Sequence, residues 1–294
     1  MVKRAAGRLS GLQVHLDVVF PVLHGTFGDD GTVQGLLELA DIPYVGAGVL
    51  GSAVGMDKDV QKRLLQAAGV PVVPFLTVTP ATWSAAPEAV RAHAASLGLP
   101  VFVKPANLGS SVGITKVTTL DALPAAVQAA FEYDTKILIE RGIDGREIEC
   151  AVLGNDDPQA SVPGEICPQA EFYSYEAKYT DEHGAELRVP APLTAAQTAT
   201  VQHLAVRVFQ LLDCAGMARV DFFLERGTDT WYVNELNTIP GFTTVSMYPK
   251  LWEASGVPYT ELISRLLELA QQRHAQRRRL KRTYTPVPAH AGTD

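Results

Sequence analysis

The sequence predicts a mixed α/β (α+β) fold, and three observations lead to this prediction. Residues 17–45 read as a short apolar run, a loop, a helix and a second extended run, an order typical of an α/β unit. Two later stretches, 100–117 and 219–237, each hold two β-rich runs around turn residues, which predicts paired strands. With 294 residues, 47% of them hydrophobic, the chain can bury cores for two or three domains.

Charge, apolar runs and cysteines argue against several classes of protein. The formal net charge of −7 argues against nucleic-acid binding. No apolar run approaches the roughly 20 residues that span a bilayer, so we expect no membrane association. The start, MVKRAAGRLSGLQVHLDVVF, is interrupted by polar residues and no cleavage site follows, so we expect no signal peptide. Cys150, Cys167 and Cys214 lack metal-ligand spacing and are expected to be reduced thiols of a cytoplasmic protein.

The first expected element is a buried strand at 17–23, which leads into the loop HGTFGDDG. A helix is expected at 32–39, and the chain becomes extended again at 43–46. In α/β folds, ligands bind beside the carboxyl ends of parallel strands, so His24 is a candidate to line a site. A loop histidine bonded only to backbone explains the same pattern equally well.

A helix is expected from residue 58 to 68, with Asp57 as its cap and Gly69 at its end. Lys58 would then lie in the first turn, where a cation opposes the helix dipole. A phosphate near Lys58 would offset this mismatch.

A glycine- and serine-rich loop, ANLGSSVG, lies between the β-rich runs of 100–117 and follows a helix expected at 87–97. Around Ser110 and Ser111, backbone N–H groups and hydroxyls could approach phosphate oxygens closely, and Lys104 would add a cation. The loop matches neither the P-loop nor the Rossmann fingerprint. An ordinary hairpin loop remains the alternative.

A candidate nucleotide pocket is marked by three residues that follow a helix expected at 121–133. Glu140, Ile143 and Glu147 lie where a strand edge could hydrogen-bond a base and where carboxylates could hold ribose hydroxyls. The elements expected here are a helix, a strand, a turn and a second strand, at 121–133, 136–140, 141–146 and 147–153.

The stretch 168–192 contains aromatic residues and a polar bend and is too irregular for a core element, so we expect a lid. Thr194 is expected to cap an amphipathic helix that ends at Leu212. A final helix is expected at 259–272. The basic and Pro/Ala/Gly-rich stretch after it is expected to be a solvated helix end followed by disorder.

The strands expected at 219–224 and 231–237 would pair as a hairpin. Because side chains alternate faces along a strand, Asp221, Glu235 and Asn237 can converge. Two carboxylates and an amide oxygen form a hard-oxygen set that suits magnesium, with substrate phosphates completing the coordination. A strand pair whose polar face is simply solvated explains the pattern equally well.

Taken together, these motifs resemble those of the D-alanine–D-alanine ligases of the ATP-grasp superfamily. The matching segments run in family order from Val19 to Pro249, and they are LHGTFGDDG, IPYVGAGVLGSAVGMDK, VFVKPANLGSSVGITKV, YEAKY, ARVDFFL and VNELNTIPGFTTVSMYP. The resemblance implies an ATP-grasp fold, in which two antiparallel-sheet subdomains clasp ATP beside a partial N-terminal α/β domain. The units expected from N- to C-terminus are the partial domain, the central subdomain, the C-terminal subdomain with the metal site, and a basic, disordered tail, at 1–57, 58–147, 148–275 and 276–294.

The resemblance also implies roles for individual residues. Phosphates would be held by Lys58, Lys104 and Lys178, and two Mg²⁺ (or Mn²⁺) ions by Asp221, Glu235 and Asn237. The other nucleotide contacts would be Ser111, Glu140, Arg141, Ile143, Glu147, Phe223 and Asn234. The active site would be closed by Ser110 and Tyr179, and the anionic transition state would be stabilised by Arg219 and the Gly241 backbone. The first substrate would lie near His24, and the second near Ser246 and Met247.

The implied activity is ATP-dependent ligation of two D-alanines for peptidoglycan precursors, by a cytoplasmic enzyme that is usually a homodimer in this family. Tyr179 after Lys178 resembles the D-alanine-selective form. One departure is that family members begin with a strand and a glycine-rich loop carrying a glutamate for the first D-alanine, and no such segment precedes Asp17. We expect the true start to lie upstream of Met1. Two alternatives stay open, which are a related carboxylate–amine ligase with another second substrate and an inactive nucleotide-binding protein.

Overall fold

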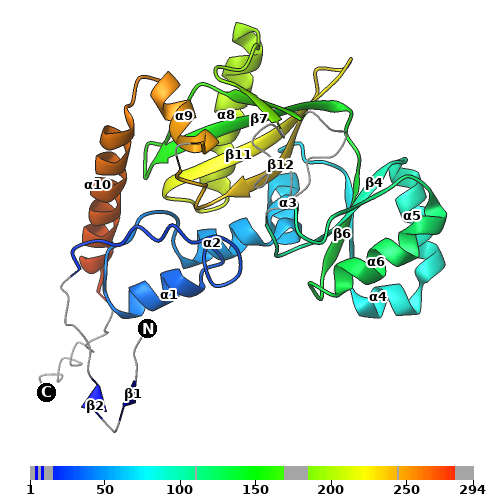
Figure 1. Cartoon of the computed structure of the whole chain (residues 1–294), viewed down its shortest axis with the longest axis horizontal. Helices are drawn as coiled ribbons and strands as arrows, with labels where there is room; N and C mark the ends of the chain where they lie inside the picture. Colours follow the sequence, from blue (N-terminus) through cyan, green and yellow to red (C-terminus); the bar gives the residue numbers. More distant parts are fainter. Residues whose placement is uncertain are drawn as a thin grey trace, which may run out of the picture.

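The computed structural model describes residues 16–109, 111–168, 185–243 and 245–281, together with the backbone of two short strands, β1 (Arg4–Ala5) and β2 (Arg8–Leu9). Within this part of the chain there are two larger antiparallel sheets, one of six strands and one of four. Figure 1 shows the smaller sheet with its helices at one end of the molecule, the larger sheet in the middle and α10 (Tyr259–Arg278) at the other end. The mixed architecture with antiparallel sheets confirms the predicted fold class.

The smaller sheet has the strand order β3-β6-β4-β5 and is covered by helices on one face. In β4, Val101 and Val103 are fully buried against those helices, so the alternation turns Phe102 and Lys104 to the opposite face. The strands are β3 (Phe75–Val78), β4 (Val101–Pro105), β5 (Thr115–Val117) and β6 (Ile137–Arg141). The helical elements are α4 (Pro80–Ala85), α5 (Pro87–Leu97), the 3-10 helix η1 (Leu120–Ala122) and α6 (Leu123–Phe131).

The larger sheet has the order β10-β9-β7-β11-β12, with β8 also paired to β7. The predicted hairpin is its β11–β12 pair, in which β11 is hydrogen-bonded on its other side to β7. The strands are β7 (Gly145–Gly154), β8 (Gln159–Ala160), β9 (Gly164–Pro168), β10 (Ala185–Arg188), β11 (Gly216–Glu225) and β12 (Trp231–Asn237).

Within the described residues, helices pack on both faces of the larger sheet, but one face is apolar along only part of its length. Val220 and Phe222 pack on α8 (Ala195–Leu211), which the predicted cap Thr194 begins. On the opposite face, Met217 packs beneath α9 (Met247–Ala254) and α10, whereas Arg219 and Asp221 further along the same face of β11 are polar. The polar half of this face is therefore where a site can form.

The N-terminal unit contains α1 (Thr32–Leu39), α2 (Val49–Met56) and α3 (Lys58–Ala67). The strand predicted at 17–23 is wrong, because only Val19 pairs, in a parallel bridge with Tyr44. Pro21 has no amide hydrogen, and the amide of Leu23 bonds back to the Pro21 carbonyl at 2.8 Å, so the run turns instead of pairing. The predicted cap of α3 is confirmed, since the Asp57 carboxylate accepts from the Val60 amide at 3.1 Å.

Two further expectations need correction. The stretch 168–192 was expected to be irregular throughout, but β10 lies within it and pairs with β9, because Leu187 can pack into the core under α9 and α10. The last helix was expected to end at residue 272, whereas α10 continues through Arg278, which makes residues 276–278 of the expected tail helical. Arg273 donates to the Tyr44 carbonyl at 3.1 Å, and Arg277 pairs with Glu38, so contacts with the N-terminal unit stabilise the added turns.

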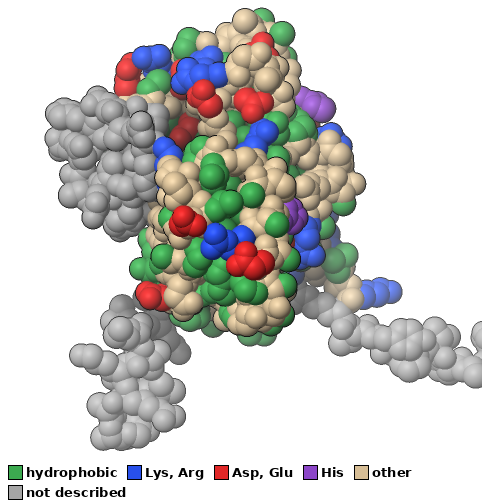
Figure 2. All heavy atoms as spheres, turned by 90° about the vertical axis from the view of Figure 1, so that its right-hand side faces the viewer, with side chains coloured by type: hydrophobic (Ala, Val, Ile, Leu, Met, Phe, Trp, Pro, Cys, Tyr) green, Lys and Arg blue, Asp and Glu red, His purple; other side chains and the backbone are tan. Residues whose placement is uncertain are grey.

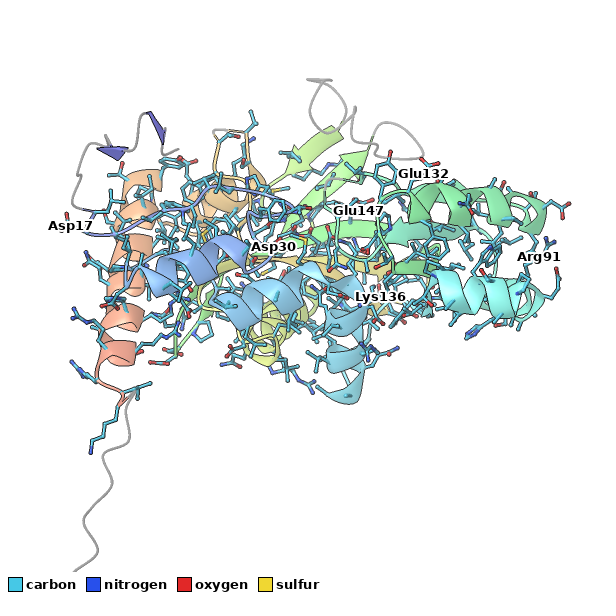
Figure 3. The ribbon with its side chains drawn as sticks, turned by 90° about the horizontal axis from the view of Figure 1, so that it is seen from below. Asp17, Asp30, Arg91, Glu132, Lys136 and Glu147 are labelled. Carbon is cyan, nitrogen blue, oxygen red and sulfur yellow. The ribbon has the colours of Figure 1, made fainter. Side chains whose placement is uncertain are left out.

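Charged side chains lie at both ends and in the middle of the molecule. On the face drawn in Figure 2, at the end formed by α4 and α5, acidic and basic side chains are interspersed. Figure 3 places Arg91 at that end and Asp17 at the opposite end, with Lys136 and Glu147 between them. No helix within the described ranges is both long and apolar enough to cross a membrane.

Candidate functional site

A cavity of about 1130 Å³ lies between the two sheets, and side chains of both sheets line it. Its size and mixed lining suit a ligand as large as a nucleotide. The smaller sheet and its loops supply Lys104, Ser111, Glu140, Arg141 and Ile143 from the predicted set, and the larger sheet supplies Glu147, Phe223 and Asn234. The fold thus brings eight predicted nucleotide contacts together from strands that are far apart in the sequence.

The most buried charges of the cavity form a cluster around Glu140. Its Oε2 lies 2.6 Å from Lys104 Nζ, and its Oε1 lies 3.2 Å from Lys62 Nζ. Burial alone would raise the pKa of Glu140, but the ammonium groups of Lys104 and Lys62 outweigh burial and hold it below its usual value. Lys104 Nζ also approaches Asn234 Oδ1 at 3.5 Å, which links the two sheets across the cavity. Glu140 is therefore ionised and held between two cations.

The hairpin brings together the predicted metal-binding residues. Asp221 lies opposite Glu235 and Arg219 opposite Asn237, so all four side chains share one face. Asn237 Nδ2 donates to Asp221 Oδ2 at 3.0 Å. A register shift between Asp221 and Phe222 leaves Asn234 as the extra residue of a bulge, and bulges commonly re-aim a side chain beside a site. Asn234 lies near Lys104, and the adjacent Glu235 lies near Lys58.

The donor chemistry of this group fits a hard divalent cation. Asp221, Glu235 and the Asn237 amide oxygen offer oxygen ligands only, the kind preferred by Mg²⁺ and Mn²⁺. Which atom of the Asn237 amide faces Asp221 is fixed only by hydrogen bonding, so a flipped amide presents its oxygen to the same place. No cluster of three or more His, Cys, Asp or Glu side chains able to hold a metal is found among the described residues, and the hairpin has two carboxylates and an amide.

Arg219 lies between two carboxylates. Its guanidinium donates to both oxygens of Asp221 at 2.7 Å and lies 3.1 Å from Glu149. Burial would lower the pKa of Arg219, but Asp221 and Glu149 outweigh burial and raise it. Arg219 is thus a permanent cation beside the candidate metal ligands. Glu149 was missed in the sequence. Strand alternation offered a signal, because it puts Glu149 on β7 and Arg219 on the neighbouring strand β11 on the same face of the sheet.

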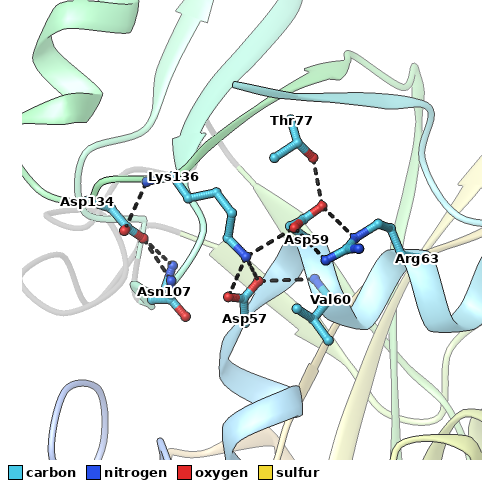
Figure 4. A network of polar contacts seen from close by, with 8 residues as sticks. All are labelled: Asp57, Asp59, Val60, Arg63, Thr77, Asn107, Asp134 and Lys136. Atoms are coloured by element: carbon cyan, nitrogen blue, oxygen red, sulfur yellow. Dashed lines mark hydrogen bonds and ion pairs between the residues drawn. The ribbon is translucent and has the colours of Figure 1, made fainter. Parts of the chain in front are cut away.

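Lys58 is held at the start of α3, close to the hairpin. Its Nζ donates to the Leu108 carbonyl of the glycine-rich loop at 2.7 Å and lies 3.3 Å from Glu235 Oε2. A network around Lys136 fixes this helix start (Figure 4). Lys136 Nζ bridges Asp57 at 2.6 Å and Asp59 at 3.0 Å, so the residue just before β6 is tied to the start of α3.

The same network reaches the glycine-rich loop. Asp134 Oδ2 accepts from the Asn107 amide at 2.8 Å and from Asn107 Nδ2 at 3.0 Å (Figure 4). Lys136 donates its own backbone N–H to the other oxygen of Asp134 at 3.2 Å. The start of α3, the turn before β6 and the glycine-rich loop are therefore held together by one set of carboxylates.

The candidate substrate residues are more dispersed. His24 is exposed and does not line the cavity, although its loop reaches the hairpin through a 3.4 Å hydrogen bond from Thr238 to the Asp29 carbonyl. Gly241 packs on Ser246, because a Cβ at Gly241 would lie 2.9 Å from the Ser246 hydroxyl oxygen. Met247 begins α9 and is buried in the core instead of lining the cavity. Ser110, Lys178 and Tyr179 lie outside the described residues, as does most of the predicted lid.

Comparison with known proteins gives the chain's relatives. Two family models match it, described as D-ala D-ala ligase N-terminus over residues 3–47 and D-ala D-ala ligase C-terminus over residues 64–268. The chain is 58% identical to the D-alanine–D-alanine ligase A of Bradyrhizobium diazoefficiens over 274 residues, covering 92% of this chain and 74% of that protein. It is 56% identical to the D-alanine–D-alanine ligase of Solibacter usitatus over 267 residues, covering 91% and 80%.

Solved structures agree with the sequence relatives. The D-alanine–D-alanine ligase from Coxiella burnetii superposes with a TM-score of 0.79 at 44% identity, covering 90% of this chain and 72% of that one. The VanG D-Ala:D-Ser ligase from Enterococcus faecalis superposes with the same TM-score at 39% identity, covering 90% and 74%. On the strength of these matches and of the cavity between its two antiparallel sheets, the chain belongs to the D-alanine–D-alanine ligase family of ATP-grasp enzymes.

Proposed function

We propose that the protein is an ADP-forming ligase that joins two D-alanines at the expense of ATP, giving D-alanyl-D-alanine for peptidoglycan precursors. The observation that carries this proposal is the cavity between the sheets, where Lys104, Glu140 and Asn234 from distant segments lie next to the Asp221–Glu235 hairpin. High identity to proteins named D-alanine–D-alanine ligase along most of the chain supports the same reaction.

In the first step, a carboxylate oxygen of one D-alanine attacks the γ-phosphorus of ATP, and the bond from that phosphorus to ADP breaks. The physical obstacle is repulsion between two anions, which fixed cations reduce without reorganising during the reaction. Lys104 and Lys58 are proposed to hold phosphate oxygens, with Lys178 and Ser111. Glu140, Arg141, Ile143, Glu147 and Phe223 are proposed to hold the nucleoside.

In the second step, the amine of the other D-alanine attacks the acyl carbon, loses a proton, and phosphate leaves with the electron pair of the broken C–O bond. Arg219 is proposed to stabilise the anionic transition state, together with the Gly241 backbone, because it is a permanent cation held by Asp221 and Glu149. Ser246 and Met247 are proposed to lie near this second substrate, and His24 near the first. Ser110 and Tyr179 are proposed to close the site.

The residues Asp221, Glu235 and Asn237 are proposed to hold two Mg²⁺ or Mn²⁺ ions. Such ions supply neutralisation of phosphate charge when bound. The oxygen-only donor set and its position beside Lys58 support this assignment.

A homodimer that works in the cytoplasm is proposed as well. Leu36 and Leu39 of α1 are 64% and 91% exposed, and such apolar residues suit a contact with a second copy. The three cysteines are free, as in a reducing compartment. Sedimentation equilibrium tests the dimer, with Leu39→Glu expected to shift the protein to monomer, and a monomeric parent protein would contradict it.

A substrate panel tests the reaction itself. Phosphate release and product mass are measured with ATP, Mg²⁺ and D-alanine alone, then with D-serine or D-lactate as the second substrate. The proposal predicts D-alanyl-D-alanine as the main product. A related solved structure is named a D-Ala:D-Ser ligase, so a main product containing D-serine would favour that second candidate function. Tight ATP binding without phosphate release would instead identify a nucleotide-binding protein.

A further inference from the structure

Lys62 is a buried cation that no part of the proposed mechanism uses. It lies one turn beyond Lys58 on α3, and its side chain is 0% exposed. Its Nζ lies 3.2 Å from Glu140 Oε1 and 5.9 Å from the centroid of the Phe75 ring. Among the described residues, this Nζ has no partner in hydrogen-bond geometry, so the ion pair with Glu140 is its main compensation.

Burying an ammonium group costs free energy, so a buried lysine suggests a structural or functional need. Ionised lysine is rarely buried because water solvates the charge far better than the protein interior does. Lys62 is not among the residues that line the cavity, so it is not placed to bind a phosphate itself. Its contact is with Glu140, which does line the cavity.

Glu140 is shared between two lysines that differ in access to the cavity. Lys104 makes the shorter contact, at 2.6 Å, and lines the cavity. Lys62 makes the longer contact and does not line the cavity. If Lys104 turns to a phosphate of ATP, Glu140 loses its closest cation while remaining only 3% exposed. If no other cation were present, leaving Glu140 buried and uncompensated would make this movement of Lys104 energetically costly.

We propose that Lys62 is a positioning residue of the nucleotide site: it is the counter-charge that stays with Glu140 and so frees the Lys104 ammonium to bind ATP phosphate. This inference rests on the proposed binding of ATP in the cavity. It assigns the two lysines different tasks, because only one of them reaches the ligand. Glu140 then stays ionised and in place for the nucleoside whether or not Lys104 has moved.

The proposal carries a pH signature. Burial lowers the pKa of Lys62 to about 8, against the opposing influence of Glu140. The charged groups that face Lys62 are Glu140 on β6, Lys104 on β4 and Glu235 on β12. Below pH 8 Lys62 is charged and the pair is intact. As the pH rises through about 8, Lys62 loses its proton, Glu140 holds Lys104 more firmly, and ATP binding weakens.

The test measures the Kd of a non-hydrolysable ATP analogue by calorimetry without D-alanine, and the KM for ATP and kcat in the full reaction. Lys62→Met is expected to raise Kd and KM about tenfold at pH 7 with a smaller effect on kcat, since a charge-assisted contact is lost. Lys62→Arg is expected to keep the affinity at pH 7 and to lose the decline above pH 8. Lys250→Met on α9, which removes a lysine outside the cavity lining, is the matched control and is expected to bind as the parent does.

The double variant Lys62→Met/Glu140→Gln separates charge from folding. Removal of both charges is expected to recover part of the affinity that Lys62→Met loses, because no carboxylate is left uncompensated and the amide oxygen still accepts hydrogen bonds. An unchanged Kd in Lys62→Met overturns the inference, and so does an alkaline decline in Lys62→Arg equal to that of the parent. If Lys62→Met does not fold, the Lys62→Arg profile and the double variant decide. A parent protein that binds no ATP analogue overturns the proposed function instead.

Discussion

At the scale of the residue, the site is organised by carboxylates that each contact more than one cation or polar group. Asp221 contacts both Arg219 and Asn237, and Glu140 contacts both Lys62 and Lys104. Ion pairs of this kind in a partly dry cavity hold charge in fixed positions, which is what transfer of a phosphoryl group between anions requires. Removing one partner therefore alters the charge of the whole group and not only one contact.

The metal assignment predicts that Asp221→Ala and Glu235→Ala each abolish ligation, lowering kcat/KM about a thousandfold or more, because divalent-cation binding is lost. The fold is expected to persist, since Arg219 keeps Glu149 as a partner at 3.1 Å. Phosphate release measures the activity, and circular dichroism checks the fold. Glu253→Ala, an exposed acid on α9, is the control. Near-normal turnover in either variant would remove the metal assignment.

Lys104→Ala is predicted to weaken ATP binding about tenfold or more, because a cation that lines the cavity is lost while Lys62 still compensates Glu140. Calorimetric titration with an ATP analogue measures this effect. Lys250→Ala on α9 is the control for loss of a lysine outside the cavity. Equal affinities in the parent and in Lys104→Ala would show that phosphate contacts lie elsewhere.

The sequence and the family resemblance predicted eight of the residues that line the cavity, but not the fully buried lysine that pairs with Glu140. Lys104, Glu140 and Asn234 were found from a loop motif, a strand edge and the family resemblance. Lys62 was missed because a lysine on an amphipathic helix usually faces solvent. The signal was its four-residue spacing from Lys58, which puts both on one helix face. That this face is the buried one depends on tertiary packing.

At the scale of the element, α3 is the part that links the small sheet, the glycine-rich loop and the hairpin. Asp57 caps it, Lys136 bridges its first-turn carboxylates, and Lys58 extends from it to Glu235. A helix start held by these contacts fixes the position of its lysine, so the network contributes to both stability and nucleotide binding.

Lys136→Met is predicted to lower the free energy of unfolding by about 2 kcal/mol, because two partly buried carboxylates lose their shared cation. It is also expected to raise the KM for ATP through the position of Lys58. Chemical denaturation and steady-state kinetics measure the two effects, with Lys250→Met as control. A variant as stable as the parent would contradict the role of the network.

The same network predicts a pH dependence of stability. Burial raises the pKa of Asp59, but Thr77, Lys136 and Arg63 outweigh burial and lower it, so its stabilising contribution is present above about pH 4 and is lost as the pH falls through its folded pKa. Asp57 and Asp59 raise the pKa of Lys136 despite burial, so its contribution is lost only as the pH rises above its usual value. Denaturation at pH 7 and pH 3 should show a smaller difference for Lys136→Met than for the parent.

Elements whose signals are local were predicted well, and elements that depend on a distant partner were not. The caps Asp57 and Thr194 predict the starts of their helices. The two strand-like runs on either side of the turn at 227–229 predict the hairpin. The run at 17–23 is apolar enough for a strand but finds a partner only at Val19. β10 pairs with β9, which is not adjacent to it in the sequence, and no local sequence pattern indicates this pairing.

At the scale of the whole molecule, the cavity exists because two sheets from separate parts of the chain face each other. Lys104 and Asn234 are 130 positions apart, and Arg141 reaches Glu225 at 2.9 Å across the same boundary. Local patterns predict each sheet but carry no information on how the sheets meet. The family resemblance supplied that information, and the structure confirms the fold class that it implied.

A ligand that contacts both sheets is predicted to stabilise the molecule as a unit. At a hundredfold excess over its Kd, Mg²⁺-ATP should add about 2.7 kcal/mol to the free energy of unfolding. Thermal denaturation with and without Mg²⁺-ATP measures the shift, and the shift should shrink in Lys104→Ala. No shift in the parent protein at saturating nucleotide would argue against a nucleotide site between the sheets.

Formation of an acyl phosphate is tested most directly by following one oxygen atom through the reaction. D-alanine labelled with ¹⁸O in its carboxylate is supplied with unlabelled ATP, and the released phosphate is analysed by mass spectrometry. Activation through an acyl phosphate transfers one carboxylate oxygen to each phosphate, so we expect phosphate carrying one ¹⁸O per molecule of dipeptide formed. Dipeptide formed with unlabelled phosphate would contradict it.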